Sequence, residues 1–551
     1  MASQISIGTS NFQVVSQADY YVDKTKMLET LMGKAQSGGS LIINRPRRFG
    51  KSLAISMIET FFSDEVRNAS QYFRGLYISH IDTRNYLSAF PVIRLSFNDV
   101  AEVGEFDTAA YLRHIIAGVY SRFQARVSAV LNEKEASDYQ AVIQREADSI
   151  VFYQALKNLT YYLTKATGKK PIVLIDEYDS VLEKRRDDEA GVAFFKAMLA
   201  ALLKDNDYLG LGILTGVFSL AKGSLGSGLN NIPVDNGLSQ ALDDNYFGFS
   251  EEEVRILLKK YHIPEEKLSE LQDYYGGYRF YNRLYFNPWS IVNYLSSGII
   301  TGYWIDSARK SAFDSLLDFA TSGSKDLVDR LTSGEQIIGK FDFTISYEDV
   351  PASIENTLLY LAMAGYLTVT QLSFNDFALA IPNKETLSMF NRLYLAHYLD
   401  KPSLNKAYGM REAILKGDSE RLAALLHDFI LSGMSYYDFG DEKNYQIMVG
   451  TIAGILLDDS QVKFEVNAGI GRCDLMISPL GNNKFGAVIE IKYYKVRKSA
   501  SRLHQGALTA LRQIKENDYL EELRIRGASP LYAYGIAFCK NNVDIVCEQI
   551  K

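Results

Sequence analysis

The chain has 551 residues, of which 47% are hydrophobic and 23% charged, an ordinary globular composition. This length exceeds what one core supports, so we expect three or four domains of about 150 residues each. The net charge of −7 excludes a globally basic nucleic-acid binder, so any such contact must be local. We find no run of about 20 apolar residues that could span a membrane and no signal-peptide pattern. The three scattered cysteines predict neither a disulfide framework nor a zinc site, and we expect a cytoplasmic protein.

The apolar segment 41–44 is followed by a basic loop and by Gly50-Lys51-Ser52 at the start of an amphipathic helix. A strand, a loop and a helix in this order predict a P-loop, whose backbone N–H groups and helix N-terminus face a polyphosphate. Lys51 would supply a point charge and Ser52 would hold Mg²⁺. Arg45 stands where the standard pattern has its first glycine, so a basic loop that only caps a helix is the alternative. The predicted nucleotide-binding residues of this loop are Arg47, Arg48, Phe49, Gly50, Lys51 and Ser52.

The apolar segment 171–175 ends in the paired carboxylates Asp176 and Glu177. Such a run predicts a buried parallel strand, and ligands bind at the carboxyl ends of these strands. Asp176 would hold Mg²⁺ through the water shell of the metal, and Glu177 would polarise the attacking water. A solvated strand end is the alternative. A third apolar segment, 211–216, contains Thr215, which could sense the γ-phosphate or simply form a turn.

The arrangement of these segments predicts an α/β protein of three parts. Residues 1–245 alternate apolar strands, including 90–97, with amphipathic helices, which is typical of a parallel sheet wrapped by helices. Residues 246–400 are mainly helical and begin with a capping-box signature at 250–253. Within them a helix at 357–361, a strand at 364–369 and a strand at 377–381 fit a winged-helix module. Residues 401–551 form the third part.

A second set of chemical residues lies near the C-terminus, where strands are predicted at 464–466, 473–477 and 487–492. A hairpin register could bring Asp474 beside Glu490, and the period of two puts Glu490 and Lys492 on one strand face. Two carboxylates with a lysine are suited to holding Mg²⁺ and activating water against a phosphodiester. Lys492 would orient the water or stabilise developing charge. A plain polar strand face is the alternative.

A basic run with no acidic residue follows this set. It consists of Lys492, Lys495, Arg497, Lys498 and Arg502, with Tyr493 and Tyr494 between them. Such a run suits an anionic backbone and base stacking, and a solvated face is its alternative. Gln513 and Tyr519, from the helix that follows, could support the site.

With these motifs, the chain resembles bacterial proteins that join an AAA-ATPase-like domain to a C-terminal PD-(D/E)XK nuclease-like domain. The resemblance extends over almost the whole length and includes residues 21–25, 45–52, 175–179, 227–231, 246–249, 277–280 and 287–290. It implies a restriction-endonuclease-like core at 471–474 and 490–492. It also implies that an upstream helical glutamate completes the metal site, with Glu442 as the candidate. Gln513 matches the helix glutamine of related exonucleases, but Asn517 stands where those proteins have a tyrosine.

We therefore predict a P-loop domain that binds and hydrolyses ATP, followed by a helical and winged-helix-like segment and a nuclease-like domain. ATP and Mg²⁺ are the expected cofactors, and nucleic acid, with DNA favoured over RNA, is the expected partner. Nucleotide state would gate access of nucleic acid to the nuclease site. One alternative is a signalling or DNA-binding ATPase with an inactive nuclease fold, and another is a scaffold that nucleotide only stabilises. The sequence leaves open whether the protein forms a homo-oligomer.

Overall fold

The computed structural model divides the chain into two compact units. Unit 1 consists of Met1–Ser296 and Arg309–Asn383, and unit 2 of Ser297–Ala308 and Lys384–Lys551. The residues that the structure describes are 8–101, 107–185, 188–218, 232–304, 327, 330–332, 334–343, 353–390, 401–433, 445–446, 449, 453, 460–468, 471–479, 484–495, 498–540 and 542–550.

Unit 1 is built on a five-stranded parallel sheet in the order β2-β3-β4-β1-β5. The strands are β1 (Gly39–Asn44), β2 (Val92–Ser96), β3 (Ile172–Asp176), β4 (Leu211–Gly216) and β5 (Val234–Asp235). The strands predicted from apolar runs are therefore present. Because all five run in one direction, their carboxyl ends meet at one edge of the sheet.

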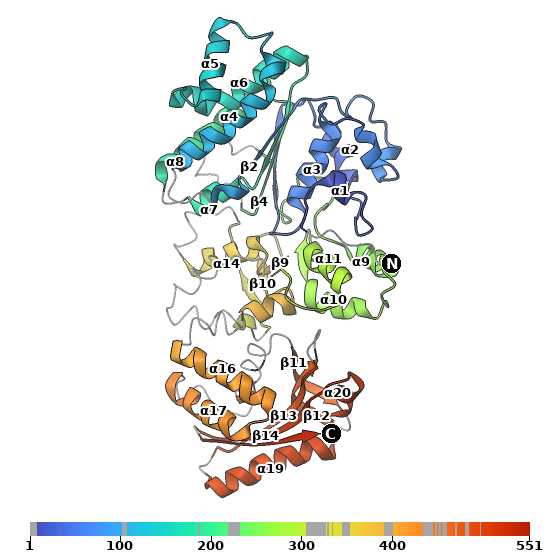
Figure 1. Ribbon diagram of the computed structural model, residues 1–551, viewed down its shortest axis with the longest axis vertical. Coiled ribbons are helices and arrows are strands. Elements are labelled where there is room, and N and C mark those ends of the chain that lie inside the picture. Colours follow the sequence, from blue (N-terminus) through green and yellow to red (C-terminus); the bar gives the residue numbers. More distant parts are fainter. Residues whose placement is uncertain are drawn as a thin grey trace. The chain divides into compact units, whose positions relative to one another are not determined.

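Helices cover both faces of this sheet (Figure 1). One face carries α1 (Phe12–Val15), α2 (Lys26–Met32) and α3 (Lys51–Phe62), and the other carries α4 (Thr108–Val127), α6 (Ser149–Thr167) and α8 (Glu189–Leu203). Along β3, Ile172 and Leu174 belong to the first core, whereas Val173 and Ile175 belong to the second. A strand buried on both faces needs apolar residues at every position, which explains its unbroken apolar run. The helix α5 (Glu133–Gln144) packs on α4, and the short helix α7 (Asp179–Lys184) follows β3.

The rest of unit 1 is a smaller assembly of helices and hairpins. Its elements are α9 (Glu251–Lys260), α10 (Lys267–Tyr275), β6 (Tyr278–Phe280), β7 (Arg283–Tyr285), α11 (Pro288–Ser297), β8 (Ile337–Gly339), α14 (Ile354–Ala364), β9 (Thr368–Gln371) and β10 (Phe377–Ala380). Ser250 and Glu253 form the predicted capping box. An antiparallel sheet in the order β8-β10-β9 follows the helix–strand–strand pattern of a winged helix. The predicted strand 364–369 was placed too early, because α14 continues to Ala364 and ends at Gly365 in the left-handed conformation.

Unit 2 contains a five-stranded mixed sheet in the order β11-β12-β13-β14-β15. The strands are β11 (Ser460–Ala468), β12 (Gly471–Pro479), β13 (Gly486–Tyr493), β14 (Leu531–Cys539) and β15 (Asn542–Ile550). Only β13 and β14 are parallel, and α19 (Ala500–Glu516) lies between them in the sequence, followed by α20 (Glu521–Ile525). The helices α16 (Lys401–Lys416) and α17 (Ser419–Gly433) cover one face, and α19 covers the other (Figure 1). The α/β fold class predicted from the sequence is confirmed.

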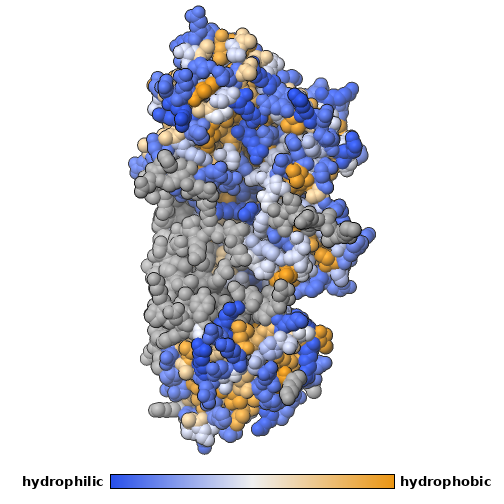
Figure 2. Space-filling view, in the orientation of Figure 1, coloured by the Kyte–Doolittle hydropathy of each residue, from blue (hydrophilic) through white to orange (hydrophobic). Residues whose placement is uncertain are grey.

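The surface is mixed in character. On the face drawn in Figure 2, hydrophilic residues cover much of the coloured surface, and apolar residues lie among them. Within the part of the chain that the structure describes, no helix combines the length and the apolar composition needed to span a membrane.

Candidate nucleotide site and nuclease-like site

The loop between β1 and α3 has the backbone that a phosphate-binding loop requires. Gly50 precedes α3 with φ 91°, so it lies in the left-handed region that favours glycine. Lys51 and Ser52 form the first turn of α3, where N–H groups have no partner within the helix. Arg48 also has a positive φ of 68°, which is uncommon for a residue with a side chain.

Lys51 is buried beside this loop. Its Nζ donates hydrogen bonds to the carbonyl oxygens of Arg45 and Pro46, both at 2.9 Å. Burial lowers the pKa of Lys51, and the negative charges of Glu177, Asp179 and Asp176 oppose this shift. The two carbonyl acceptors of the ammonium group are neutral. A phosphate oxygen is charged and would be a stronger acceptor in their place.

Two predicted site residues meet at the carboxyl ends of β3 and β4. Asp176 is 1% exposed and pairs with Thr215 across the parallel strands. The Oγ1 of Thr215 donates a hydrogen bond of 2.6 Å to Oδ1 of Asp176. Thr215 thus orients the carboxylate predicted to hold Mg²⁺.

Glu177 follows Asp176 with a φ of 50°. The hydroxyl of Ser180 donates to its Oε2 at 3.1 Å, and the side-chain amide of Asn98 lies against both carboxylate oxygens. Asn98 was missed by the sequence analysis. The signal was its position just after β2, the strand beside β3.

A third carboxylate at this edge was also missed. Asp179 is buried, and its Oδ2 accepts hydrogen bonds from the N–H groups of Val217 and Phe218, at 2.7 and 2.9 Å. Burial raises the pKa of Asp179 to about 6, although these two bonds and the charge of Lys51 act in the opposite direction. Asp179 therefore fixes the chain that leaves β4 beside the predicted metal-binding carboxylate.

Arg45 is a structural residue of the loop. Its side chain is fully buried, with an ion pair of 2.5 Å to Asp235 and a hydrogen bond of 3.0 Å to Asn245. It also donates to the hydroxyl of Tyr281 at 3.0 Å, and its guanidinium lies 5.1 Å from the ring centre of Phe247. The residue in place of the first P-loop glycine thus joins the loop to segments 190 or more residues away.

The next loop side chains also contact distant elements. Arg47 forms an ion pair of 2.8 Å with Glu183 of α7, and the hydroxyl of Tyr360 in α14 donates to the same carboxylate at 3.0 Å. Arg48 places its guanidinium 4.3 Å from the ring centre of Trp289 in α11.

The side chain of Phe49 is buried in an aromatic cluster with Tyr278, Phe280 and Tyr285. Its ring lies edge-on to those of Tyr278 and Phe280, with centroids at 4.9 and 5.5 Å. Among the predicted nucleotide-binding residues, Phe49 can therefore offer only its backbone.

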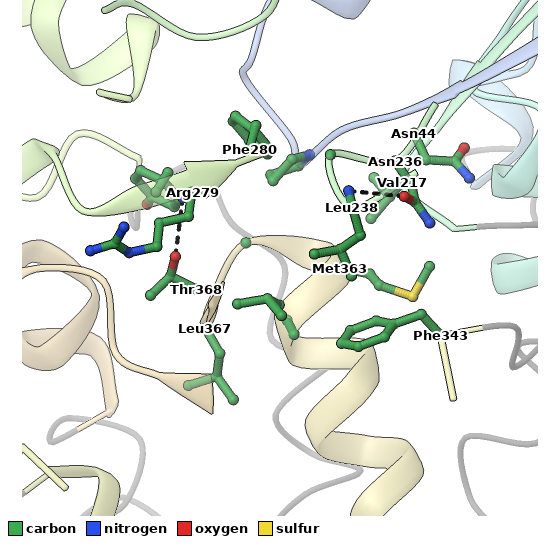
Figure 3. A pocket seen from close by; sticks show the side chains of 16 residues that line it. Asn44, Val217, Asn236, Leu238, Arg279, Phe280, Phe343, Met363, Leu367 and Thr368 are labelled. Atoms are coloured by element: carbon green, nitrogen blue, oxygen red, sulfur yellow. Dashed lines mark hydrogen bonds between the residues drawn. The ribbon is translucent and has the colours of Figure 1, made fainter. Parts of the chain in front are cut away.

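A small pocket lies beside the loop (Figure 3). Pro46 lines it from the loop, Met363 from α14, Leu367 from the connection after α14, and Thr368 from β9. Next to it, a Cβ added to Gly365 would come within 2.6 Å of Pro46, so this glycine permits a close approach of α14 to the loop. None of the predicted nucleotide-binding residues lines this pocket, so it is separate from the predicted phosphate site.

In unit 2 the structure brings the predicted carboxylates together. Leu475 pairs with Ile489 in the antiparallel register of β12 and β13, which places Asp474 next to Glu490. The N–H of Asp474 donates to Oε2 of Glu490 at 3.4 Å. Lys492, on the same face of β13, donates from Nζ to Oε1 of Glu490 at 3.1 Å.

Two amide side chains hold these carboxylates. Gln513 of α19 donates to Oε1 of Glu490 at 2.5 Å, and Gln446 donates to Oδ1 of Asp474 at 2.9 Å. Gln513 was a predicted supporting residue, whereas Gln446 was missed because nothing in its surroundings suggested a role. Burial and the charge of Asp474 raise the pKa of Glu490 to about 7, and Lys492 opposes this shift.

This pair fits a divalent cation, because repulsion between the buried carboxylate of Glu490 and the half-buried one of Asp474 is relieved by a positive charge. Within the described residues, however, no group of three or more His, Cys, Asp or Glu side chains could hold a metal. Further ligands would have to come from backbone oxygens, water or substrate. The candidate Glu442 lies outside the described residues, and so does Arg497.

The basic run is partly committed to packing. Tyr493 stacks on Tyr445, with ring centroids 5.1 Å apart, and Lys498 places its Nζ 5.5 Å from the ring centre of Tyr494. Lys495 and Arg502 are exposed. The exposed charge next to the carboxylate pair thus comes from lysine and arginine, while Tyr493 serves the core.

Comparison with known proteins finds a matching family model in each unit. Residues 6–226 match the family model described as a predicted AAA-ATPase, and residues 440–548 match that of the PD-(D/E)XK nuclease superfamily. The chain joins an AAA-ATPase-like domain to a PD-(D/E)XK nuclease-like domain. This confirms the resemblance drawn from the sequence motifs and supports a nucleotide-binding ATPase with a nuclease-like domain.

A relative covers nearly the full length. The chain is 24% identical over 568 residues to an "Uncharacterized protein in vnfD 5'region" of Azotobacter chroococcum mcd 1, with 98% of each protein covered. Among solved structures, the ORC2 protein of Aeropyrum pernix in its ADPNP-ADP complexes is 12% identical, with a TM-score of 0.25 over 71% of this chain and 95% of that one. Drosophila ORC bound to AT-rich DNA and Cdc6 is 10% identical, with a TM-score of 0.18 over 69% and 92%. Both scores are too low to support an argument about function.

Proposed function

We propose that the AAA-ATPase-like domain binds and hydrolyses ATP with Mg²⁺, and that the nuclease-like domain cleaves nucleic acid, with DNA favoured, in a Mg²⁺-dependent reaction. One observation carries the first half. Lys51 lies at the start of α3, and the negative charges of Asp176, Glu177 and Asp179 at the carboxyl edge of the sheet act on its ammonium group.

In this proposal each group of the first site has one task. Lys51 exchanges two loop carbonyls for phosphate oxygens, and Ser52 and Asp176 hold the metal. Glu177, held by Ser180 and Asn98, accepts a proton from the attacking water.

Two variants test the ATPase. ATP·Mg²⁺ should raise the melting temperature of the wild type, and Lys51→Ala should abolish the shift, because a ligand stabilises only the state that it binds. Glu177→Gln should keep the shift but lower turnover by roughly 10²–10⁴-fold, the usual worth of a general base. An equal shift in Lys51→Ala would place the nucleotide elsewhere, and wild-type turnover in Glu177→Gln would exclude this residue as the base.

The second half of the proposal is supported by the contact of Asp474 with Glu490 and by the bond from Lys492. Asp474 and Glu490 would hold Mg²⁺, which supplies charge neutralisation and an acidified water. Lys492 would orient that water, and the exposed Lys495 and Arg502 would contact the substrate backbone.

A cleavage assay tests this site on single-stranded DNA, double-stranded DNA and RNA, with Mg²⁺ or Mn²⁺. Asp474→Ala and Glu490→Ala should stop cleavage and leave the melting temperature close to that of the wild type. The matched control is Glu548→Ala, which removes a carboxylate from β15 of the same sheet that pairs with Lys515 outside the site. Equal cleavage by all four proteins would point to another site or to a contaminant.

We also propose that nucleotide state gates the nuclease-like domain. Cleavage by the wild type should then differ between ATP and ADP, and Lys51→Ala should respond to neither. The same rate under all conditions would show that the two activities are independent.

The second candidate function is a DNA-binding or signalling ATPase with an inactive nuclease fold. The observation in its favour is that the described residues place only two carboxylates, Asp474 and Glu490, at the site. Binding of DNA without cleavage in every metal tested would select this function.

A further inference from the structure

We infer that Arg48 exchanges partners when nucleotide binds: its guanidinium leaves the ring of Trp289 and takes the polyphosphate. The nucleotide would thereby break a contact between the P-loop and α11. This inference rests on the proposed nucleotide site and adds to it a role for the side chain of Arg48 and a switched contact.

Within the described residues, Arg48 is the loop cation whose guanidinium donates no hydrogen bond. Arg45 is buried in an ion pair, Arg47 is paired with a carboxylate, and Lys51 donates to two carbonyl oxygens. The side chain of Arg48 is exposed, and among the described residues its guanidinium has no hydrogen-bond acceptor. Its only close partner there is the ring of Trp289, at 4.3 Å. The contact with the ring uses none of the N–H donors in a hydrogen bond to an acceptor, so they are available to a ligand.

The position of Arg48 fits contact with a polyphosphate. It lies two residues before Gly50, and Glu177 is near enough for its charge to act on the guanidinium. Arg48 therefore lies toward the carboxylate edge where the phosphates are expected. Its φ of 68° is the second observation, because a side-chain-bearing residue held in the left-handed region often marks a functional segment.

Trp289, in contrast, is fixed. It lies in the first turn of α11, where Oδ1 of Asn287 accepts the N–H groups of Trp289 and Ser290 at 2.9 and 3.4 Å. Ile291 and Tyr294 anchor the same helix in the core. A change in the contact would consequently come from movement of Arg48.

The contact that Arg48 would gain is stronger than the contact that it would lose. A cation–π contact at an exposed site is weak, whereas a guanidinium and a phosphate form parallel, charge-assisted hydrogen bonds. The indole would then lose its cation whenever the polyphosphate is bound, so its fluorescence can report the exchange.

The chain is suited to this measurement because it contains two tryptophans, Trp289 and Trp304. Trp304→Phe leaves Trp289 as the sole emitter, and the difference between the wild type and Trp289→Phe gives the same signal in a second way. Nucleotide binding is followed independently by the thermal shift.

We expect ATP·Mg²⁺ to change the emission of Trp289. Tripolyphosphate with Mg²⁺ should reproduce the change at saturation, and adenosine should not, because the phosphates take the guanidinium. Nucleotide-free Arg48→Met should already emit like the ATP-bound wild type, and ATP should change it no further. Its Kd for ATP should rise roughly tenfold or more, as expected for a lost charged hydrogen bond, and Arg48→Lys should recover part of this loss.

Three results would overturn the inference. A thermal shift by ATP with unchanged Trp289 emission would show that Arg48 keeps its partner. An equal emission change in Arg48→Met would show that nucleotide acts on Trp289 without Arg48. No thermal shift in the wild type would overturn the proposed nucleotide site, and this inference with it.

Discussion

The two sites use lysine and carboxylates in opposite ways. In the nucleotide site, Lys51 is bonded to backbone carbonyls, and Asp176, Glu177 and Asp179 act on it only through their charge. In the nuclease-like site, Lys492 is bonded directly to Glu490.

This difference bears on the ion that each site is proposed to bind. A lysine held by neutral acceptors can transfer to an anion at low cost. Two adjacent carboxylates, one with a raised pKa, are stabilised by a cation. The proposal that the first site binds phosphate and the second a metal ion rests on this difference, and four predictions test it.

The largest effect should come from Arg45, which holds the nucleotide loop in place. Arg45→Ala leaves Asp235 buried without its cation and should lower the free energy of unfolding by about 3–5 kcal/mol. Urea denaturation measures this, and Arg84→Ala, which removes an exposed pair with Asp82, is the control with little effect. If the two variants were equally stable, Arg45 would not anchor the loop.

The second effect concerns the amides of the nuclease-like site. Gln513→Ala and Gln446→Ala should each weaken Mg²⁺ binding by roughly 10–100-fold, because residues that orient metal ligands contribute this much. Calorimetric titration of Mg²⁺ measures the change, with the exposed Gln505 of α19 replaced by alanine as the control. Wild-type affinity in both amide variants would mean that the carboxylates are oriented by other groups.

The third effect is a pH dependence of stability without metal. The pKa of Glu490 is raised from 4.5 to about 7 in the folded protein. The protonated side chain therefore stabilises the fold below pH 4.5, and this stabilisation is lost as the pH rises through 7. Relative to Glu490→Gln, the wild type should lose on the order of 2 kcal/mol between pH 4.5 and 8 in EDTA. Urea denaturation at both pH values checks this, and a constant difference would mean that Glu490 titrates normally.

The smallest effect should be on salt dependence. Replacing Lys495 and Arg502 with glutamine should weaken DNA binding for all sequences and lower the salt slope by about 1 for each lost phosphate contact. Lys515→Gln, which removes a lysine already paired with Glu548, is the matched control. An unchanged slope in the double variant would place the DNA elsewhere.

Much of the fold could be predicted from local sequence patterns. Apolar runs predicted β1, β3 and β4, and the serine–glutamate spacing predicted the start of α9. The register that joins Asp474 and Glu490 was also accessible, because the two residues lie on neighbouring antiparallel strands with a short connection. The end of α14 was placed wrongly, since a glycine helix cap was taken as the start of a strand.

By itself, the sequence determined β1 to β4 of the parallel sheet, β11 to β13 of the mixed sheet and the residue types at the strand ends, because periodicity and strand ends are local properties. It did not predict β5, β14 or β15. Only the tertiary structure decided the partners of the loop side chains. Arg45 meets Asp235 across 190 residues, and Arg48 meets Trp289 of α11. Gln446 reaches Asp474 from 28 residues away. Such contacts depend on how whole elements pack, and this packing cannot be predicted from the spacing of residues along the chain.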